Sequence, residues 1–463
     1  MNLTIDDLFS IPHRSARNLV SGNRMSFSGV STDTRSLRNG EVYFALPGEK
    51  FDGHDFVDEA FRKGAGCAVI AEHADDGRWN ARPVLVVEST VAALGTLARR
   101  WRSKFTIPVV AVGGSNGKTT TKEMIARVLR KKYETLSTEG NLNNHLGVPK
   151  TLFRLTPEHE VAVIEVGTNH PGEITYLCEM LNPTHGMITN IGREHLEFFR
   201  TVEGVAAAEG ELFRGMGKDA TGFVNNDDEY VVDLAKRVRK KVTYGFTAKA
   251  SSVSGKFLTM DDRGCAQFAV SPRGGRSYSV HLSVPGMHTM SNALAAAAVG
   301  MEFEVSPQDI RHALETFTAV GKRMEVLRAG NVTILNDTYN ANPESVISAL
   351  ETLGGMNTRG KKIVVLADML ELGDTSPAEH VSLGKKVSAM GFGYLFTFGE
   401  MARRIHDAAA VPMKVHYDQK NVLAEFLVEL VAPGDVVLVK GSRGMKMEDV
   451  VTFLVERLQR KPE

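Results

Sequence analysis

The stretch from residue 109 to residue 125 constrains this chain more than any other, because a glycine-rich turn joins an apolar run to a helix. The run Val109–Val112 is typical of a buried strand, and apolar residues recur at helical spacing from Met124 to Leu129. The residues between them include Gly-Ser-Asn-Gly-Lys-Thr. Such a turn lets backbone N–H groups approach an anion, and the helix N-terminus adds partial positive charge. The pattern therefore predicts a strand–loop–helix unit that binds phosphate groups.

Two side chains of this loop indicate a nucleoside triphosphate accompanied by Mg²⁺. Lys118 can neutralise β- and γ-phosphate oxygens, and the hydroxyl of Thr119 can ligate the cation. The strict Walker spacing requires glycine at position 112, which is valine here, so the loop is a variant form. An ordinary strand–turn–helix junction is the alternative, but it rarely combines this glycine spacing with Lys-Thr. We therefore predict an ATP site that includes Gly114, Ser115, Asn116, Gly117, Lys118, Thr119 and Thr120.

The size and charge of the chain exclude several other classes. Its 463 residues suggest about three domains. Lys plus Arg and Asp plus Glu both number 55, so no overall field favours nucleic acid or an acidic membrane. Three cysteines are too few for a disulfide framework and fit a reducing compartment. Without a signal core or an apolar run of membrane-spanning length, we expect a cytoplasmic protein, with a monomer as the simplest state.

Apolar segments alternate with helical stretches along the chain, which is typical of α/β proteins. Strands are expected early in the chain at 41–46, 67–71, 84–87, 161–166 and 186–191. The βαβ rhythm then becomes regular, with expected strands at 332–335, 363–367, 394–398 and 436–439. We predict three α/β domains in series: a first domain at 1–105, a central P-loop ATPase domain at 106–318 and a doubly wound, Rossmann-like domain at 319–463.

Two polar side chains follow apolar strands of the central domain. Glu165 is flanked by buried positions and needs a charge partner, for which the Mg²⁺ of the loop or a salt bridge would serve. Because the carboxyl ends of an open parallel sheet gather at the ligand crevice, we favour the metal. His195 also follows a strand, but a lone histidine is more often structural, and imidazole is a less usual Mg²⁺ ligand than oxygen.

Two polar loops follow strands of the third domain. Residues 336–343 carry five polar side chains before a proline at an expected helix start, which fits a well-capped turn or a ligand loop equally. Residues 440–446 form a glycine-flexed basic turn that can bind an anion, although a solvated turn would have a similar composition. The residues by themselves leave both alternatives open.

Several long motifs occur in the order that one family shows. The segments 114–120, 165–167 and 286–296, followed by Asp337, resemble the Mur ligases, the ATP-dependent amide ligases of peptidoglycan precursor synthesis. Within that family, the members that add D-alanyl-D-alanine to UDP-N-acetylmuramoyl tripeptide are most similar at 138–149, 167–174, 337–343, 367–373 and 440–445. The resemblance extends essentially from end to end, including residues 31–35 and 51–56 of the first domain.

The resemblance implies a ligase that uses ATP to convert the tripeptide carboxylate into an acyl phosphate, which the amine of D-alanyl-D-alanine then attacks. Two anions must be brought together, so electrostatic stabilisation and positioning carry most of the catalysis. The resemblance assigns Lys118 to the phosphates, Thr119 and Glu165 to one Mg²⁺, and His195 to a second Mg²⁺. It also implies nucleotide contacts from Asn292, Arg323, Asp337 and Tyr339.

The same resemblance implies two groups of substrate-binding residues. The first domain supplies Ser31, Thr32, Asp33, Arg35 and Asp52. The other two domains supply Asn141, Asn143, Asn144, Asn169, His170, Asn340, Asn342, Lys440, Ser442 and Arg443. Because residues of the third domain are expected beside phosphates held by the second, the third domain must close over the second, with a pivot around 317–322.

One departure from the family pattern matters for the predicted chemistry. Where the family usually reads Ala-Lys-Gly-Glu-Ile-Phe, this chain reads Ala-Glu-Gly-Glu-Leu-Phe, with Glu209 in place of the lysine. That lysine is typically carbamylated, which turns it into a long carboxylate near the second Mg²⁺. Our hypothesis is that Glu209 replaces the carbamate as a catalytic metal ligand, directly or through a water. The alternative is that the role has been lost.

Three other functions compete with this ligation: a sister ligase of the same family, a nucleotide-dependent switch, and an inactive ligase. The asparagine-rich segments 141–144 and 340–342 argue against a sister ligase. The polar loops of the third domain argue against a switch, because a switch needs no second substrate lobe. Because Glu209 replaces the lysine that the family usually has, an inactive ligase remains an alternative.

Overall fold

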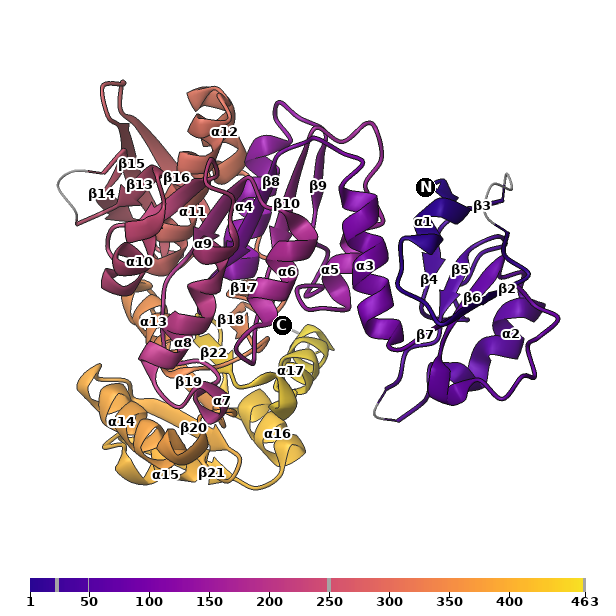
Figure 1. Cartoon of the computed structure of the whole chain (residues 1–463). Helices are drawn as coiled ribbons and strands as arrows, with labels where there is room; N and C mark the ends of the chain where they lie inside the picture. The colour runs from indigo at the N-terminus through magenta and orange to yellow at the C-terminus, as the bar shows by residue number, and fades with distance from the viewer. Residues whose placement is uncertain (21–24, 49, 248–250, 461–463) are drawn as a thin grey trace.

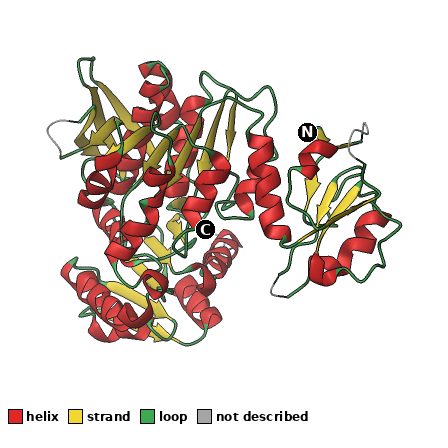
Figure 2. Ribbon diagram, in the orientation of Figure 1, coloured by secondary structure: helices red, strands yellow, loops and turns green. Residues whose placement is uncertain are grey.

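The computed structural model describes residues 1–20, 25–48, 50–247 and 251–460. Three largely parallel sheets follow one another along the chain, each flanked by helices (Figure 1; Figure 2). The predicted α/β class is therefore confirmed. In Figure 1 the indigo N-terminal unit stands to one side of the central sheet, and the orange and yellow C-terminal unit lies below that sheet.

The N-terminal unit is built on a five-stranded sheet in the order β2-β7-β6-β5-β4, parallel except for β2. Strands β6 and β7 are continuous apolar runs because both of their faces are buried. Strands β1 and β3 form a separate short antiparallel ribbon. The elements are β1 (Leu3–Thr4), α1 (Ile5–Phe9), β2 (Ser15–Arg17), β3 (Ser26–Phe27), β4 (Val30–Ser31), β5 (Val42–Phe44), α2 (Val57–Arg62), β6 (Cys67–Ala71) and β7 (Val84–Val87).

The central domain contains a nine-stranded sheet in the order β16-β15-β14-β13-β12-β11-β8-β10-β9. Strands β8 to β14 run parallel, and β15 and β16 extend the sheet as an antiparallel edge. The elements are β8 (Val109–Gly113), α4 (Lys118–Leu129), β9 (Thr135–Ser137), α5 (Gly147–Leu152), β10 (Val161–Glu165), α6 (Glu173–Leu181), β11 (His185–Ile188), α7 (Leu196–Phe199), α8 (Val202–Glu209), α9 (Glu211–Gly215), β12 (Thr221–Asn225), α10 (Glu229–Leu234), β13 (Lys240–Gly245), β14 (Val253–Met260), β15 (Cys265–Pro272), β16 (Tyr278–Pro285), α11 (Met287–Glu302) and α12 (Pro307–Glu315).

Strand β8 shows how the sequence pattern produces this layered packing. Its successive side chains point to opposite faces of the sheet. Val110 and Val112 belong to the core formed with α4 and the alanine-rich α11, whereas Val109 and Ala111 belong to the core formed with α5 and α6. A fully apolar run is therefore required here, since both faces of β8 are covered.

Helix α3 (Thr90–Arg102) connects the N-terminal unit to the central domain. It packs against α5 and α6 of the central domain. Near its C-terminal end, the guanidinium of Arg102 donates a 3.0 Å hydrogen bond to the carbonyl of Leu181. Gly95 faces Tyr176, and a Cβ at position 95 would overlap the tyrosine hydroxyl. Close packing and a buried hydrogen bond thus join the first unit to the second.

The C-terminal domain contains a six-stranded sheet in the order β17-β18-β22-β19-β20-β21, parallel except for β17. Helices α13, α14 and α15 share a core with one face, and α16 and α17 share a core with the other, so the domain is doubly wound. The elements are β17 (Glu325–Ala329), β18 (Val332–Asp337), α13 (Pro343–Gly355), β19 (Lys362–Ala367), α14 (Ser376–Ala389), β20 (Tyr394–Phe398), α15 (Ala402–Ala408), β21 (Met413–Tyr417), α16 (Lys420–Leu430), β22 (Val436–Lys440) and α17 (Glu448–Arg460).

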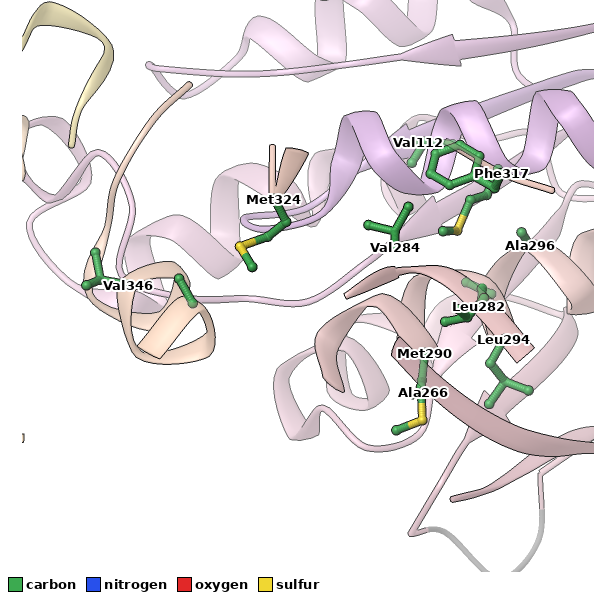
Figure 3. Close-up of a cluster of buried hydrophobic side chains, with 14 of the residues drawn as sticks. Val112, Ala266, Leu282, Val284, Met290, Leu294, Ala296, Phe317, Met324 and Val346 are labelled. Carbon is green, nitrogen blue, oxygen red and sulfur yellow. The ribbon is translucent and has the colours of Figure 1, made fainter. Parts of the chain in front are cut away.

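One hydrophobic core crosses the boundary between the central and C-terminal domains. Val284 and Met290 belong to the same cluster of buried side chains as Met324 and Val346 (Figure 3). The first two residues lie in β16 and α11, and the other two lie just before β17 and in α13. Each of the four is no more than 5% exposed. Apolar burial, at about 25 cal/mol per Å², therefore contributes to the docking of the two domains.

Two further features of the structure are the state of the cysteines and the character of the helices. Cys67, Cys178 and Cys265 are all free thiols in buried positions. Among the residues that the structure describes, no helix combines the length and the apolar character needed to span a bilayer.

Acid should destabilise this fold through His185, which starts β11. Its ring packs against the rings of Phe223 and Phe303, and burial lowers the pKa of His185 to about 4. Between that value and an unfolded pKa of about 6.5, the unfolded chain binds the proton and the folded chain does not, so stability falls as the pH falls. We expect a loss of about 2 kcal/mol from pH 7 to pH 5 through this residue.

Urea unfolding at pH 7 and pH 5 measures this effect. His185→Phe should lose less stability across that interval than the unmodified protein. Equal losses in the two proteins would contradict the assignment.

Candidate active site

A cavity of about 720 Å³ lies between the central and C-terminal domains, at the carboxyl ends of strands from both sheets. Most of the predicted site residues line it, although they come from widely separated segments. Those from the central domain are Ser115, Asn116, Gly117, Lys118, Thr119, Thr120, Asn141, Asn143, Asn144, Glu165, Asn169, His195 and Asn292. Those from the C-terminal domain and the segment before it are Arg323, Asp337, Tyr339, Asn340, Asn342, Lys440, Ser442 and Arg443.

The remaining predicted residues lie outside the lining of this cavity. Gly114 donates its N–H to Glu209, and the ring of His170 packs against Phe198, 4.8 Å between centroids. The other five, in the N-terminal unit, are Ser31, Thr32, Asp33, Arg35 and Asp52. Within that group, Asp33 accepts hydrogen bonds from Arg35, and Asp52 caps a short 3₁₀ helix by accepting from the His54 N–H.

The glycine-rich loop adopts a backbone that requires glycine at two positions. Gly114 has φ +112° and Gly117 has φ +79°, both in the left-handed region. A Cβ at Gly114 would lie 2.7 Å from the backbone nitrogen of Thr189. Ser115 N–H donates to the carbonyl of Asn190 at 2.8 Å, which fixes the loop against the segment after β11. The loop thus enters α4 at Lys118, as the sequence predicted.

Lys118 is the central cation of the cavity. Its ammonium donates hydrogen bonds to the carbonyl of Gly114 and, at 3.3 Å, to the carboxylate of Glu194. Burial acts to lower the pKa of Lys118, but the nearby carboxylates of Glu194 and Glu209 outweigh burial and raise that pKa above its usual value. Lys118 therefore stays charged. Glu194, one residue before His195, is a site residue that the sequence analysis missed.

Glu165 and Thr119 have the properties of ligands for a hard cation. One carboxylate oxygen of Glu165 accepts a 2.8 Å hydrogen bond from Asn143, and the other is buried without a hydrogen-bond partner among the described residues. The hydroxyl-bearing Thr119 is 3% exposed and lines the same cavity. Mg²⁺ prefers oxygen ligands of these kinds, so the residues fit the predicted cation.

His195 lies where the two domains meet. It has φ +50° and precedes α7. Its Nδ1 is 2.6 Å from a carboxylate oxygen of Glu371 in the C-terminal domain, and its Nε2 is 4.0 Å from Glu194. The contact with His195 lowers the pKa of Glu371 below its ordinary value. Glu371 was missed as a site residue, although it belongs to the segment 367–373 that resembled the family.

Glu209 contacts the glycine-rich loop and is not among the residues that line the cavity. It is the last residue of α8 and is 1% exposed. One of its carboxylate oxygens accepts a 2.6 Å hydrogen bond from Gly114 N–H, and the other is buried without a hydrogen-bond partner among the described residues. Burial raises the pKa of Glu209 to about 7, although the charge of Lys118 opposes this shift.

The C-terminal domain presents cations and an aromatic ring to the cavity. The guanidinium of Arg323 lies 3.6 Å from the centroid of the Tyr339 ring, and that of Arg443 lies 5.6 Å from it. Asp337 forms a 2.5 Å ion pair with Lys440. His288 also lines the cavity, and desolvation there lowers its pKa. The cavity therefore joins carboxylates from the central domain to cations from both domains.

Direct polar contacts hold the two domains together around the cavity. Arg193, just before Glu194, makes ion pairs of 2.6 Å with Glu344 and 2.9 Å with Glu379. The amide of Asn342 donates a 2.9 Å hydrogen bond to Asn116 in the loop. The sequence analysis missed Arg193, which connects the segment after β11 to α13 and α14.

Loss of the Arg193 guanidinium should weaken the contact between the central and C-terminal domains. The two ion pairs are partly exposed, so each contributes about 1 kcal/mol or less. We expect Arg193→Ala to lower kcat/KM about fivefold and to increase the radius of gyration in small-angle scattering. Arg404→Ala, an exposed substitution on α15, is the matched control. Unchanged dimensions and kinetics in Arg193→Ala would refute the role.

Comparisons with known proteins match the whole length of this architecture. The chain matches the Mur ligase family, catalytic domain, at residues 26–102, the Mur ligase middle domain at 112–300, and the Mur ligase, glutamate ligase domain, at 322–443. It is 37% identical over 442 residues to the UDP-N-acetylmuramoyl-tripeptide--D-alanyl-D-alanine ligase of Escherichia coli (strain K12), covering 94% of this chain and 96% of that protein. The Bacillus subtilis (strain 168) protein of the same name is 35% identical, covering 92% and 93%.

Solved structures give the same result. A crystal structure of MurF from Acinetobacter baumannii superposes with a TM-score of 0.89 at 29% identity and covers 98% of this chain and 99% of that one. MurF ligase from Thermotoga maritima, in complex with ADP, gives a TM-score of 0.84 at 29% identity, covering 94% and 98%. The predicted resemblance is confirmed: the chain belongs to the Mur ligase family.

Proposed function

We propose that this protein is an ATP-dependent ligase that joins D-alanyl-D-alanine to a UDP-N-acetylmuramoyl tripeptide in peptidoglycan precursor synthesis, releasing ADP and phosphate. The observation that carries the proposal is that one cavity is lined by both the glycine-rich loop and the polar loops of the C-terminal domain. The relatives named for this reaction support it over nearly their whole length. The ADP bound in the Thermotoga maritima relative supports nucleotide use.

In the proposed mechanism, the loop residues and Lys118 bind the triphosphate. Thr119 and Glu165 would hold one Mg²⁺, and His195 would contribute to a second. Bound Mg²⁺ supplies positive charge that offsets the phosphate oxygens and orients them. Lys118, kept charged by the carboxylates around it, neutralises the γ-phosphate as the tripeptide carboxylate attacks it.

The C-terminal domain completes the nucleotide site in this proposal. The ring of Tyr339 holds the guanidinium of Arg323 at the cavity, where it can stabilise phosphate charge. Asp337 and Asn292 contact the nucleotide from the two domains. The acyl phosphate formed on the tripeptide is then attacked by the amine of D-alanyl-D-alanine, and the closed domains exclude water that would hydrolyse it.

The N-terminal unit would bind the UDP part of the substrate through the residues predicted there, and the asparagines of the cavity would orient the peptide. We further propose that the enzyme acts in the cytoplasm as a monomer. The balanced charge of the chain and its three free thiols support this part of the proposal.

A coupled assay of ADP and phosphate release tests the proposed reaction. It is run with ATP alone, with each substrate alone, and with the UDP-muramoyl tripeptide and D-alanyl-D-alanine together. We expect turnover only when both substrates are present. ATP turnover with neither substrate would indicate a switch, turnover with a different acceptor would indicate a sister ligase, and no turnover with both would indicate an inactive relative.

A further inference from the structure

The carboxylate of Glu209 is directed at the backbone of the glycine-rich loop. Its Oε2 accepts the N–H of Gly114 at 2.6 Å, so the side chain is hydrogen-bonded directly to the loop backbone. The same oxygen lies 2.8 Å from the position that a Cβ on Gly113 would occupy. The side chain therefore packs tightly beneath the loop, and glycine at 113 makes this approach possible.

Both backbone polar groups of Gly114 form hydrogen bonds with ionisable side chains, one acidic and one basic. Its N–H donates to Glu209, and its carbonyl accepts from the ammonium of Lys118. Its φ of +112° lies in a region that L side chains rarely adopt, so the surrounding contacts must maintain this conformation. Of the two contacts, the one to Lys118 lies on the cavity side, where phosphate would compete for the ammonium. Glu209 does not line the cavity, so its contact with Gly114 can persist when nucleotide binds.

We propose that Glu209 is a positioning residue that keeps the loop in its phosphate-binding conformation through Gly114 N–H. This proposal rests on the nucleotide site proposed above and changes the role that the sequence suggested for this glutamate. A cation ligand would act from within the cavity, whereas Glu209 lies outside its lining and has one oxygen committed to the loop. The departure from lysine at 209 thus supplies an acceptor for the loop backbone.

Two substitutions distinguish the effect of the hydrogen bond from Gly114 N–H from the effect of the negative charge of Glu209. Glu209→Ala removes the acceptor, and Glu209→Gln keeps an oxygen that can accept from Gly114 N–H while removing the charge. Glu203→Ala is the matched control, because Glu203 is an exposed residue of the same helix that accepts a hydrogen bond at the surface from Tyr230. If Glu209→Ala does not fold, Glu209→Asp replaces it, since the shorter side chain withdraws the oxygen but keeps the charge.

Hydrogen–deuterium exchange of the nucleotide-free protein gives the first readout. In Glu209→Ala we expect amides of the peptide covering residues 113–117 to exchange about tenfold faster, with Glu209→Gln and Glu203→Ala close to the unmodified protein. The second readout is ADP binding by calorimetry in EDTA. We expect Kd about tenfold higher in Glu209→Ala, partial or full rescue in Glu209→Gln, and no change in Glu203→Ala.

Unchanged loop exchange and unchanged metal-free ADP binding in Glu209→Ala would overturn the proposal, and a shift in the Mg²⁺ requirement alone would assign Glu209 to the cation instead. Equal losses in Glu209→Ala and Glu209→Gln would also overturn it, because the retained acceptor would then not matter. If the unmodified protein fails to bind ADP, the proposed function fails, whereas the exchange experiment still tests the contact between Glu209 and the loop.

Discussion

Lys118→Met should lower ATP-dependent ligation by at least about 10³-fold, because it removes the cation that the cavity places at the phosphates. Methionine keeps most of the length of the side chain, so the loss isolates the ammonium. The negative charges of Glu194 and Glu209, which raise the pKa of Lys118, would then act on the triphosphate without a compensating cation. We expect both weaker ATP binding and a lower kcat, since the ammonium interacts with the nucleotide and with the charge that moves during transfer. Steady-state kinetics of phosphate release measure both quantities.

The matched control for this substitution is Lys131→Met, which changes an exposed lysine just beyond the C-terminal end of α4. It should retain the activity of the unmodified protein. Thermal unfolding of both variants separates loss of chemistry from loss of fold. Ligation within tenfold of the unmodified rate in Lys118→Met would contradict the assignment of this lysine.

Lys440→Met should destabilise the C-terminal domain by about 3 kcal/mol, because it leaves a buried carboxylate without its partner. The side chain of Lys440 is 3% exposed and that of Asp337 is 13% exposed, and their charged atoms are 2.5 Å apart. Lys440 also donates to the carbonyl of Asn340 at 2.9 Å, so the loop after β18 loses a second contact. Urea unfolding gives the change in the free energy of unfolding.

A double-mutant cycle distinguishes this ion pair from a general effect of the substitution. Asp337→Asn combined with Lys440→Met should be less destabilised than the sum of the single variants, because the isolated charge is gone. Lys385→Met, on the exposed face of α14, should leave stability unchanged. Additive losses in the cycle would show that the two residues do not stabilise each other.

The sequence predicted the buried parallel strands well, because a strand covered on both faces is a continuous apolar run. The segments expected at 67–71, 84–87 and 394–398 coincide with β6, β7 and β20. The antiparallel edge formed by β14, β15 and β16 was not predicted. Its residues are mixed in character, with exposed positions such as Phe257 and Leu258 in β14, so no apolar run marks those strands.

The candidate site was predictable where its residues follow strands, and not where they depend on the docking of two domains. Glu165 and Asp337 end β10 and β18, so the topology of parallel sheets brings each to a carboxyl edge. Glu371 lies 176 residues after His195 in the numbering, and nothing in the local sequence of either indicates that they touch. Glu209 was recognised by its departure from the family, but only the structure gives the direction of its carboxylate.

The hydrophobic core that extends from α11 to α13 affects whether the protein can be divided into separate domain fragments. Val284, Met290, Met324 and Val346 belong to one buried cluster that spans the boundary between the central and C-terminal domains (Figure 3). A fragment cut at that boundary would expose this apolar surface to water and would favour self-association. Isolated fragments are therefore expected to self-associate, even though each keeps its own sheet.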